Sequence, residues 1–252
     1  MDERIAGKHK LGGSYMPEIV KRGYEPTDKK EFSDEIDKLR SAGEELYYLI
    51  NRGYPIKSAS VFVGNHHLLS ERQRLALVRS ISLEVAIKSR KDKEVFKLTG
   101  KTVYIDTFNT VITLETAFSG STLLSCMDGT IRDLAGLRGT YRLIDKTDMA
   151  LDAIKRILEE ENVIKAVFLI DAPVSNSGRL KQRIEEYLSA SKVTAICEVI
   201  NDVDKNLYDK ENVITSDAII LDKCISWFNL TKRVIEENLK DYPFVMLNRF
   251  PH

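Results

Sequence analysis

The sequence predicts an α/β protein in which a small helical module precedes a parallel sheet. From about residue 96 onward, short β-branched runs alternate with segments of helical periodicity, which is typical of a parallel sheet covered on both sides. Before that point, apolar residues recur at three- and four-residue spacing, which indicates helices. We therefore expect an irregular arm at 1–30, a basic helical module at 31–95 and a three-layer, Rossmann-like α/β domain at 96–252.

The composition is that of an ordinary globular protein. Of 252 residues, 43% are hydrophobic and 30% are charged, which excludes a disordered chain. No apolar run approaches the roughly 20 residues of a membrane span, and no apolar segment follows the N-terminal charges, so we expect neither a membrane anchor nor a secretory signal. Three widely spaced cysteines disfavour a disulfide framework and fit the cytoplasm. Homo-oligomerisation is left open.

The net charge of zero hides an uneven distribution. Residues 52–101 hold 11 Lys and Arg against 4 Asp and Glu, and residues 102–252 hold 18 against 23. A basic part beside an acidic part suggests a polyanion-binding module, with RNA as the expected partner, next to a metal-binding one. Chance placement of solvated surface charge is the alternative, and it explains the counts equally well.

The helical module is expected to contain two helices. The first is SDEIDKLRSAGEELYYLINRGYP, with Ser33 as its N-cap and Gly53 and Pro55 at its end. SASVFVGNHHLL then indicates a short apolar segment with a turn at Gly64. Ser70 begins the second helix, which runs to about residue 90. Its expected inner residues are Leu75, Val78, Ile81 and Val85, and its expected outward basic residues are Arg72, Arg74, Arg79, Lys88 and Arg90.

In the α/β domain, five strands and three helices follow from the apolar pattern. The strands are expected at 103–105, 166–170, 193–199, 213–215 and 244–247. The helices are expected at 147–160, 178–190 and 217–239, the last with Trp227 in the core.

Three of the expected strands lead into an aspartate: VYID at Asp106, VFLID at Asp171 and VITSD at Asp217. Ligands of an open parallel sheet collect beyond the carboxyl ends of its strands, so these carboxylates are expected to converge on one crevice. Like charges at close range stay ionised only around a cation, and hard oxygen ligands suit Mg²⁺ or Mn²⁺. The alternative is that each aspartate caps the following helix, which is the more frequent role for any single one.

Two loops carry groups suited to phosphate. DAPVSNSGRL offers Ser175, Asn176, Ser177 and Arg179 before a helix, although the same residues also suit an ordinary loop and N-cap. RDLAGLRGTYR gathers Arg132, Arg138, Arg142 and Tyr141, which could hold and stack a nucleic acid or form a solvated loop.

Several other polar residues are left with open roles. Glu115 could face the crevice or the surface, and Asp128 and Asp133 are weaker candidates for the acidic site. His66 and His67 are adjacent and would point to opposite faces of an extended strand, so a shared metal is not expected.

Five motifs together resemble an uncharacterised prokaryotic family with a helical domain and an α/β domain, both of unknown function. They are YYLINRGYP…SASVFVGNHHLLSERQRLALVR, DTFNTVITLE, RDLAGLRGTYR, DAPVSNSGRL and TSDAIILD, and they span about residues 35–235.

The C-terminal half also distantly resembles the PIN and NYN nucleases, which place D-G-x-N after their first strand and further aspartates after later strands. Asp106 and Asn109 match that motif, with Thr107 in place of the glycine, and Asp171 and Asp217 match the later acids. The resemblance implies a Mg²⁺- or Mn²⁺-dependent ribonuclease or related phosphodiesterase, with Asn109 orienting the first carboxylate.

Two other functions compete with this one. DTFNTV also resembles the haloacid dehalogenase motif D-x-[DFY]-x-T-[LV], which implies a phosphatase with Asp106 as nucleophile and Thr110 assisting it. Phe108 stands where that motif normally has its second acid. The third candidate is a non-catalytic RNA-binding adaptor, in which the acidic crevice is structural.

Overall fold

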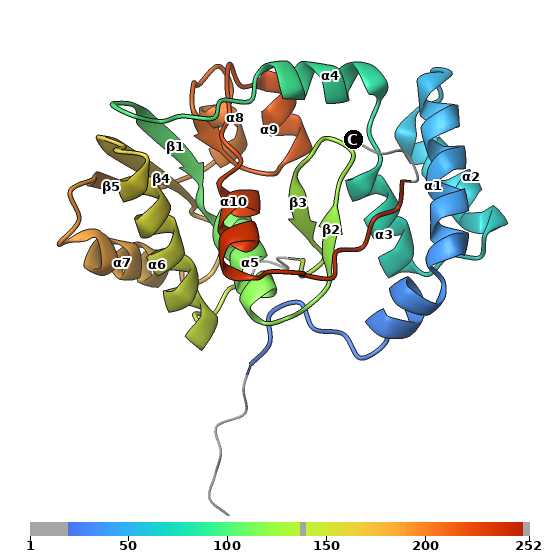
Figure 1. Ribbon diagram of the computed structural model, residues 1–252, viewed down its shortest axis with the longest axis horizontal. Coiled ribbons are helices and arrows are strands. Elements are labelled where there is room, and N and C mark those ends of the chain that lie inside the picture. The colour runs from blue at the N-terminus through green and yellow to red at the C-terminus, as the bar shows by residue number, and fades with distance from the viewer. Residues whose placement is uncertain (1–19, 137–139, 249–252) are drawn as a thin grey trace, which may run out of the picture.

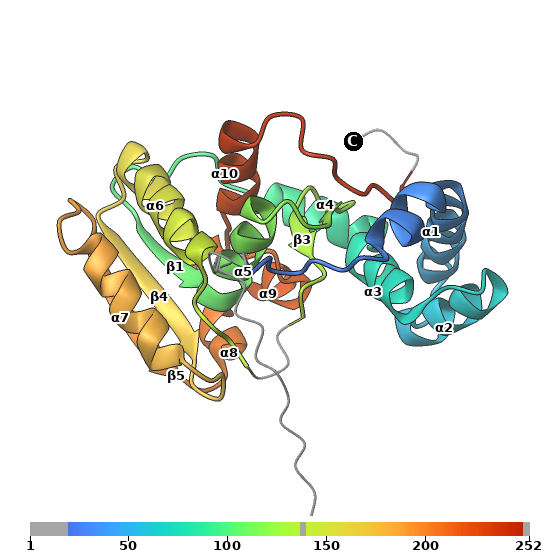
Figure 2. The same ribbon diagram turned by 90° about the horizontal axis from the view of Figure 1, so that it is seen from below.

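A computed structural model describes residues 20–136 and 140–248 of the chain. The helical part lies at one end of the molecule and the parallel sheet at the other, in both views of the ribbon (Figures 1 and 2). No helix within the described ranges is long and apolar enough to cross a membrane.

The helical part contains four α-helices preceded by a π-helical turn. These elements are η1 (Lys29–Asp34), α1 (Ile36–Asn51), α2 (Ile56–His66), α3 (Glu71–Ser80) and α4 (Glu84–Asp92). The expected start at Ser70 is confirmed, because its hydroxyl accepts from Gln73 N and the Gln73 side chain accepts from Ser70 N, a capping box. The expected N-cap at Ser33 is wrong, since Ser33 lies inside η1.

Two further expectations for the helical part are wrong. The segment with the expected turn at Gly64 is helix α2, which buries Ala59, Val63 and Gly64 on one face. The expected helix from Ser70 to residue 90 is interrupted at 81–83, where the backbone is extended at Ile81. The interruption changes the inner face: Ala76, Leu77 and Ile81 are buried, whereas Leu75, Val78 and Val85 are exposed.

The α/β part contains six strands and six helices within the described residues. The strands are β1 (Thr102–Asp106), β2 (Leu123–Ser125), β3 (Ile131–Asp133), β4 (Lys165–Asp171), β5 (Thr194–Ile200) and β6 (Val213–Ile214). The helices are α5 (Thr107–Phe118), α6 (Asp145–Glu160), α7 (Ser177–Leu188), α8 (Val203–Leu207), α9 (Ala218–Lys223) and α10 (Leu230–Asn238).

Four of these strands form one parallel sheet in the order β5-β4-β1-β6, and β2 and β3 form a separate antiparallel hairpin. The predicted α/β class with a parallel sheet is therefore confirmed. The chain builds outward from β1 through β4 to β5 and then returns to the other side of β1 with β6. The sheet thus has its topological switch point between β1 and β6, where ligands of open α/β sheets collect.

Alternate residues of the central strands face two different apolar clusters. Ile105 of β1 and Phe168 of β4 pack in a cluster that includes residues of α5, α6, α7 and α10. Tyr104 and Val167, on the opposite face, pack with residues of α8 and α9 and with Trp227. This alternation with period two buries both faces of the sheet.

The C-terminal third differs from its expected elements. The expected helix at 217–239 is two helices, and the segment between them carries Trp227 across a sheet face, where its indole N–H donates to the Arg90 carbonyl oxygen at 2.7 Å. Trp227 is buried as expected, although not in a helix. The expected strand at 244–247 makes a single bridge, between Val245 and Leu124, and is not part of the parallel sheet.

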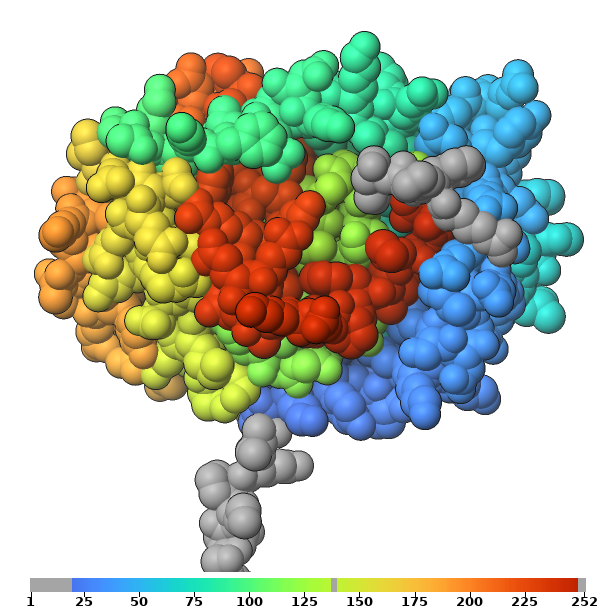
Figure 3. Space-filling model, in the orientation of Figure 1, coloured from blue at the N-terminus to red at the C-terminus, as the bar shows by residue number. Residues whose placement is uncertain are grey.

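The apolar core of the helical part includes residues from the other part of the chain. Leu124, Met127 and Leu134, in and around the β2-β3 hairpin, pack with α1 and α3, and so does Leu247 from the C-terminal segment. Figure 3 shows that segment, in red, running across the molecular face towards the helical part. A Cβ atom on Gly43 of α1 would collide with the Leu247 carbonyl oxygen, so glycine allows this close approach.

Candidate functional site

Three aspartates lie where adjacent parallel strands end at the switch point. Asp106 is the last residue of β1, Asp171 is the last residue of β4, and Asp217 follows β6 and begins α9. Because β4, β1 and β6 are neighbours and parallel, all three residues lie at the same edge of the sheet. The sequence-predicted trio is therefore assembled at one edge.

A fourth aspartate, Asp204, reaches the same group from helix α8, which follows β5. Its charge raises the pKa of both Asp106 and Asp171, and the charge of Asp217 raises the pKa of Asp204 in turn. Sequence reasoning missed Asp204 because it stands four residues beyond its strand. The aspartates of NDVDKN could have indicated it, since each of the other three strands of the sheet also ends at or just before an aspartate.

Burial and mutual repulsion disfavour the charged forms of these carboxyl groups. Burial raises the pKa of Asp106 to about 7, the charges of Asp217, Asp171 and Asp204 add to the effect, and a hydrogen bond from Thr215 opposes it. Burial also raises the pKa of Asp171 and of Asp204. Asp106 is the buried member of the group, whereas Asp171 and Asp217 are half-buried and Asp204 is exposed.

Asp217 caps the helix that follows it, whereas Asp106 does not. Asp217 is a cap, because its carboxylate accepts from the N–H groups of Ile219 at 2.8 Å and Ile220 at 3.1 Å. Asp106 occupies the N-cap position of α5, yet its side chain makes no capping hydrogen bond. The position of Asp106 is therefore not explained by capping.

Thr215 and Ser216 connect the ends of β1 and β6. The Thr215 hydroxyl donates to Asp106 Oδ2 at 2.8 Å and accepts from Asp217 N at 3.0 Å. Asn109 Oδ1 accepts from Ser216 N at 2.8 Å and from the Ser216 hydroxyl at 2.9 Å. Thr215, which the sequence reasoning missed, is thus the residue that orients the first carboxylate, and Asn109 instead fixes the loop that carries Thr215.

The acidic site suits a hard cation that keeps part of its water shell. To share one ion, three side chains need one ligand atom each within 4.8 Å of the other two. Among the described residues, Asp106, Asp171 and Asp217 do not form such a set. Direct coordination of one ion by all three therefore does not fit this arrangement. Mg²⁺ commonly uses one or two carboxylates and several waters, so at most two of these aspartates would ligate such an ion.

The predicted phosphate loop before α7 is tied mainly to the protein itself. The Ser177 hydroxyl is buried and lies 2.6 Å from the carbonyl oxygens of Asp171 and Val174. Ser175 Oγ accepts from Tyr141 N at 3.2 Å, and the Asn176 side chain donates to the Tyr141 carbonyl at 2.6 Å. Arg179 is exposed. Ser175 is exposed as well, but Arg179 is the exposed residue of the four whose side chain makes no hydrogen bond to another described residue.

The predicted arginine cluster is dispersed. Arg132 is buried rather than solvated, and it donates to the Ser216 carbonyl oxygen at 2.7 Å and to Asp128 at 2.5 Å. Arg142 is exposed. Arg138 lies outside the described residues. Arg132 therefore supports the loop below the crevice and is not available to hold a nucleic-acid backbone.

The three acids whose roles were open do not join the site. Glu115 is fully buried and accepts from the Tyr141 hydroxyl at 2.6 Å and from Arg22 Nε at 2.7 Å, so it faces neither the crevice nor solvent. Asp128 pairs with Arg132 and with Arg90 at 2.6 Å. Asp133 accepts from Thr113 at 2.7 Å.

The basic face expected on the helical part is reduced by internal pairing. Arg90 is buried and binds Asp128 and Asp222, which contradicts its expected outward position. Arg72 binds Asp28 at 2.5 Å, and Arg79 donates to the Asp133 carbonyl oxygen. Lys88 is exposed as expected.

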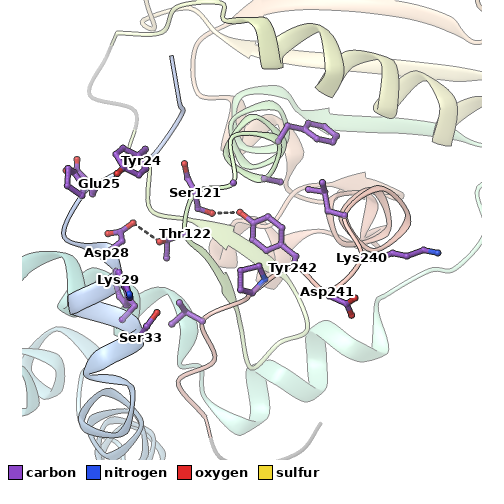
Figure 4. Close-up of a pocket in the computed structure, with 18 residues that line it drawn as sticks. Tyr24, Glu25, Asp28, Lys29, Ser33, Ser121, Thr122, Lys240, Asp241 and Tyr242 are labelled. Carbon is purple, nitrogen blue, oxygen red and sulfur yellow. Dashed lines mark hydrogen bonds between the residues drawn. The ribbon is translucent and has the colours of Figure 1, made fainter. Parts of the chain in front are cut away.

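One pocket lies away from these acids, at the opposite end of α5. Its volume is about 620 Å³, and it lies between the 24–33 segment, the end of α5 and the 239–245 segment. Its polar groups bind each other: the Tyr242 hydroxyl donates to the Ser121 carbonyl oxygen, and the Thr122 hydroxyl donates to Asp28 at 2.6 Å (Figure 4). We therefore place the candidate site at the acidic edge, where the electrostatics are perturbed.

Comparison with known proteins gives a family and no activity. Residues 95–233 match the family described as "Domain of unknown function (DUF5616)", and residues 38–93 match "Protein of unknown function (DUF434)". An uncharacterized protein of Methanocaldococcus jannaschii is 37% identical over 185 residues, which cover 73% of this chain and 88% of that protein. No solved structure matches the chain. The protein is therefore a member of the DUF5616 family with a DUF434 segment ahead of it, the two-part family of unknown function that its motifs predicted.

Proposed function

We propose that the protein is a Mg²⁺- or Mn²⁺-dependent phosphodiesterase that acts on RNA through the aspartates at the carboxyl edge of its sheet. One observation supports this most strongly: Asp106 and Asp171 are the last residues of β1 and β4, and Asp204 and Asp217 follow β5 and β6 at the same edge of the parallel sheet. Arg132 lies close enough to Asp217 for their charges to interact, whereas burial and neighbouring carboxylates raise the pKa of Asp106, of Asp171 and of Asp204. A divalent cation is the group that would relieve this repulsion.

Asp106 and Asp171, on adjacent strands, are the primary cation ligands in this proposal. Asp204 and Asp217 add negative charge next to these two ligands. Thr215 holds the Asp106 carboxylate in place, as partners of metal ligands commonly do. Asp106 and Asp171 would hold a Mg²⁺ or Mn²⁺ ion there, which would supply an activated water and neutralise charge on the scissile phosphate.

The PIN-like, three-layer architecture is part of the same proposal. It is supported by the burial of both sheet faces and by the position of the acids at the switch point. Arg179 and Arg142 are exposed and follow strand β4 and hairpin strand β3, respectively. We assign them to the RNA backbone, which they would bind through charge-assisted hydrogen bonds.

The phosphatase alternative has less support. A haloacid dehalogenase-like enzyme would use Asp106 as nucleophile and a second acid two residues later. Phe108 occupies that position and is buried, with its ring 5.1 Å from the ring of Tyr141. The side chain at this position therefore offers no proton donor to a leaving group.

Calorimetric titration with Mn²⁺ tests the proposal on the intact protein and on Asp106→Asn, Asp171→Asn. We expect the double variant to lose at least about tenfold in Mn²⁺ affinity, because both assigned ligands lose their charge. The variant Asp34→Asn, Asp152→Asn removes the same two charges from exposed positions and should bind Mn²⁺ like the parent.

Cleavage of single-stranded RNA and of a phosphomonoester should then be assayed side by side with Mn²⁺. RNA cleavage that is lost in the Asp106, Asp171 variant is the expected result. Turnover of the phosphomonoester alone would favour the phosphatase. Equal Mn²⁺ affinity in the parent and the double variant would overturn the proposal and leave the aspartates with a structural role.

A further inference from the structure

We propose a second, chemically different metal site on the helical part, formed by Glu45, His66 and His67 and suited to Zn²⁺ or a similar transition-metal ion. One ligand atom from each of these side chains lies within 4.8 Å of the other two. No other set of three His, Cys, Asp or Glu residues among the described ones meets this condition. Two imidazoles and one carboxylate are a common ligand set for zinc with an open fourth position.

The two histidines converge because the chain here is the end of a helix and not a strand. His66 is the last residue of α2 and His67 is its C-cap. Their rings lie edge to face, with centroids 4.9 Å apart. The expectation that the side chains of His66 and His67 point to opposite faces is therefore wrong, because it assumed an extended backbone.

A specific turn ends α2 and fixes the direction of the chain at the histidine pair. Leu68 N donates to the Asn65 carbonyl at 3.2 Å and Leu69 N donates to the Gly64 carbonyl at 2.8 Å, which is the Schellman arrangement. Leu68 therefore has a left-handed backbone, with φ of 51°, which usually requires glycine or asparagine. Its side chain is 84% exposed, so packing does not explain a leucine there.

The third ligand comes from the neighbouring helix. Glu45 lies in α1, and its Oε2 is 2.9 Å from His67 Nε2. Two ligand atoms on one tetrahedral zinc ion are about 3.4 Å apart, given bonds of about 2.1 Å. The Glu45–His67 distance of 2.9 Å is shorter than that value and the other two distances do not exceed 4.8 Å, so small side-chain rotations suffice to admit the ion.

The surroundings favour a cation and allow it to enter. The carbonyl end of a helix carries partial negative charge, and the site lies at that end of α2. His66 is exposed, and the side chain of Glu45 is 44% exposed. A bound ion would join the end of α2 to the middle of α1 and would keep one coordination position for water.

Zn²⁺ titration of the intact protein, followed by calorimetry, tests this site. Because imidazole selects zinc while carboxylate oxygens alone suit Mn²⁺, the two metal sites can be separated. We expect Glu45→Gln, and separately the pair His66→Ala, His67→Ala, to lower Zn²⁺ affinity by at least about tenfold. Mn²⁺ affinity should be unchanged in both.

Matched variants make the result specific. Glu44→Gln removes the same charge from the adjacent residue of α1 and should keep Zn²⁺ affinity, as should Asp106→Asn, Asp171→Asn. The variant His9→Ala, His252→Ala removes the two remaining histidines and should also keep it. A rise in melting temperature with Zn²⁺ should be seen in the parent and lost in Glu45→Gln. Zn²⁺ affinity that survives loss of His66 and His67, or no Zn²⁺ binding by the parent, would overturn the proposal.

Discussion

Asp128 is the residue through which three segments of the chain are connected. It is buried and accepts hydrogen bonds from Arg90 of α4 and from Arg132, which also binds the loop before α9. Burial by itself would raise the pKa of Asp128, but Arg132, Thr130 and Arg90 outweigh it and lower that pKa below its ordinary value of 3.8.

We therefore predict that Asp128→Asn lowers the free energy of unfolding at pH 7 by about 3–5 kcal/mol, because it removes the carboxylate that two buried arginines share and leaves only Arg90 with another acidic partner, Asp222. A carboxyl group with a lowered pKa stabilises the fold above its unfolded pKa, and this contribution is lost as pH falls through the folded value. The difference in free energy of unfolding between the parent and Asp128→Asn should hence shrink below about pH 4.

Urea unfolding from pH 7 down to pH 3 measures both effects. Asp152→Asn, at an exposed position of α6, is the matched control and should change little at any pH. A constant difference between parent and Asp128→Asn across that range would contradict the assigned role.

At this scale the sequence predicted strand-end residues well and loop residues poorly. Asp106, Asp171 and Asp217 could be grouped because the carboxyl ends of parallel strands share an edge. Arg132 and Ser177 could not be placed, because the direction of a loop side chain depends on contacts with distant segments or within the loop. Ser216 supplies such a contact to Arg132, whereas Ser177 binds back to Val174 within its own loop.

The end of helix α2 is the element whose backbone departs most from what its residue type prefers. Leu68 occupies the left-handed position of the closing turn. We predict that Leu68→Gly raises the free energy of unfolding by about 1 kcal/mol, because glycine adopts this conformation without strain and little buried surface is lost. Thermal and urea unfolding measure the change.

Leu83→Gly provides the comparison, since Leu83 is also exposed but has an ordinary extended backbone. It should lower stability, because glycine there adds freedom to the unfolded chain with no strain to relieve. Destabilisation by Leu68→Gly of the same size would show that the Leu68 conformation is not strained.

Among the elements, helices with a strong apolar stripe were predictable and breaks were not. The expected helix at 147–160 is α6, and the expected strand at 166–170 is β4. Gly64 suggested a turn, yet it lies in α2, where glycine leaves room for the side chain of Arg74. The breaks after α3 and α9 are set by burial of Ile81 and Trp227 against other segments.

The whole molecule is joined by the C-terminal segment that crosses from α10 to the helical part. Leu247 is fully buried in the apolar cluster that also contains residues of α1 and α3. We predict that Leu247→Ala lowers the free energy of unfolding by about 2–5 kcal/mol, the range for a buried leucine. Urea unfolding followed by far-ultraviolet circular dichroism measures this loss.

Met246→Ala is the neighbouring control, because Met246 is 45% exposed and its truncation should cost clearly less. Fluorescence of Trp227, the single tryptophan, reports on the sheet. It should follow the same transition as circular dichroism in the parent. Two separate transitions would mean that the helical part and the sheet unfold independently.

The crossing of the C-terminal segment also affects how the protein is made. The helices of residues 36–92 leave the ribosome first, but the cluster that they surround is completed by Leu124, Met127 and finally Leu247. Their apolar faces therefore stay exposed while about 150 further residues are synthesised, at roughly 5–20 residues per second. For several seconds of each synthesis, the nascent helical part therefore exposes apolar residues that are buried in the folded protein.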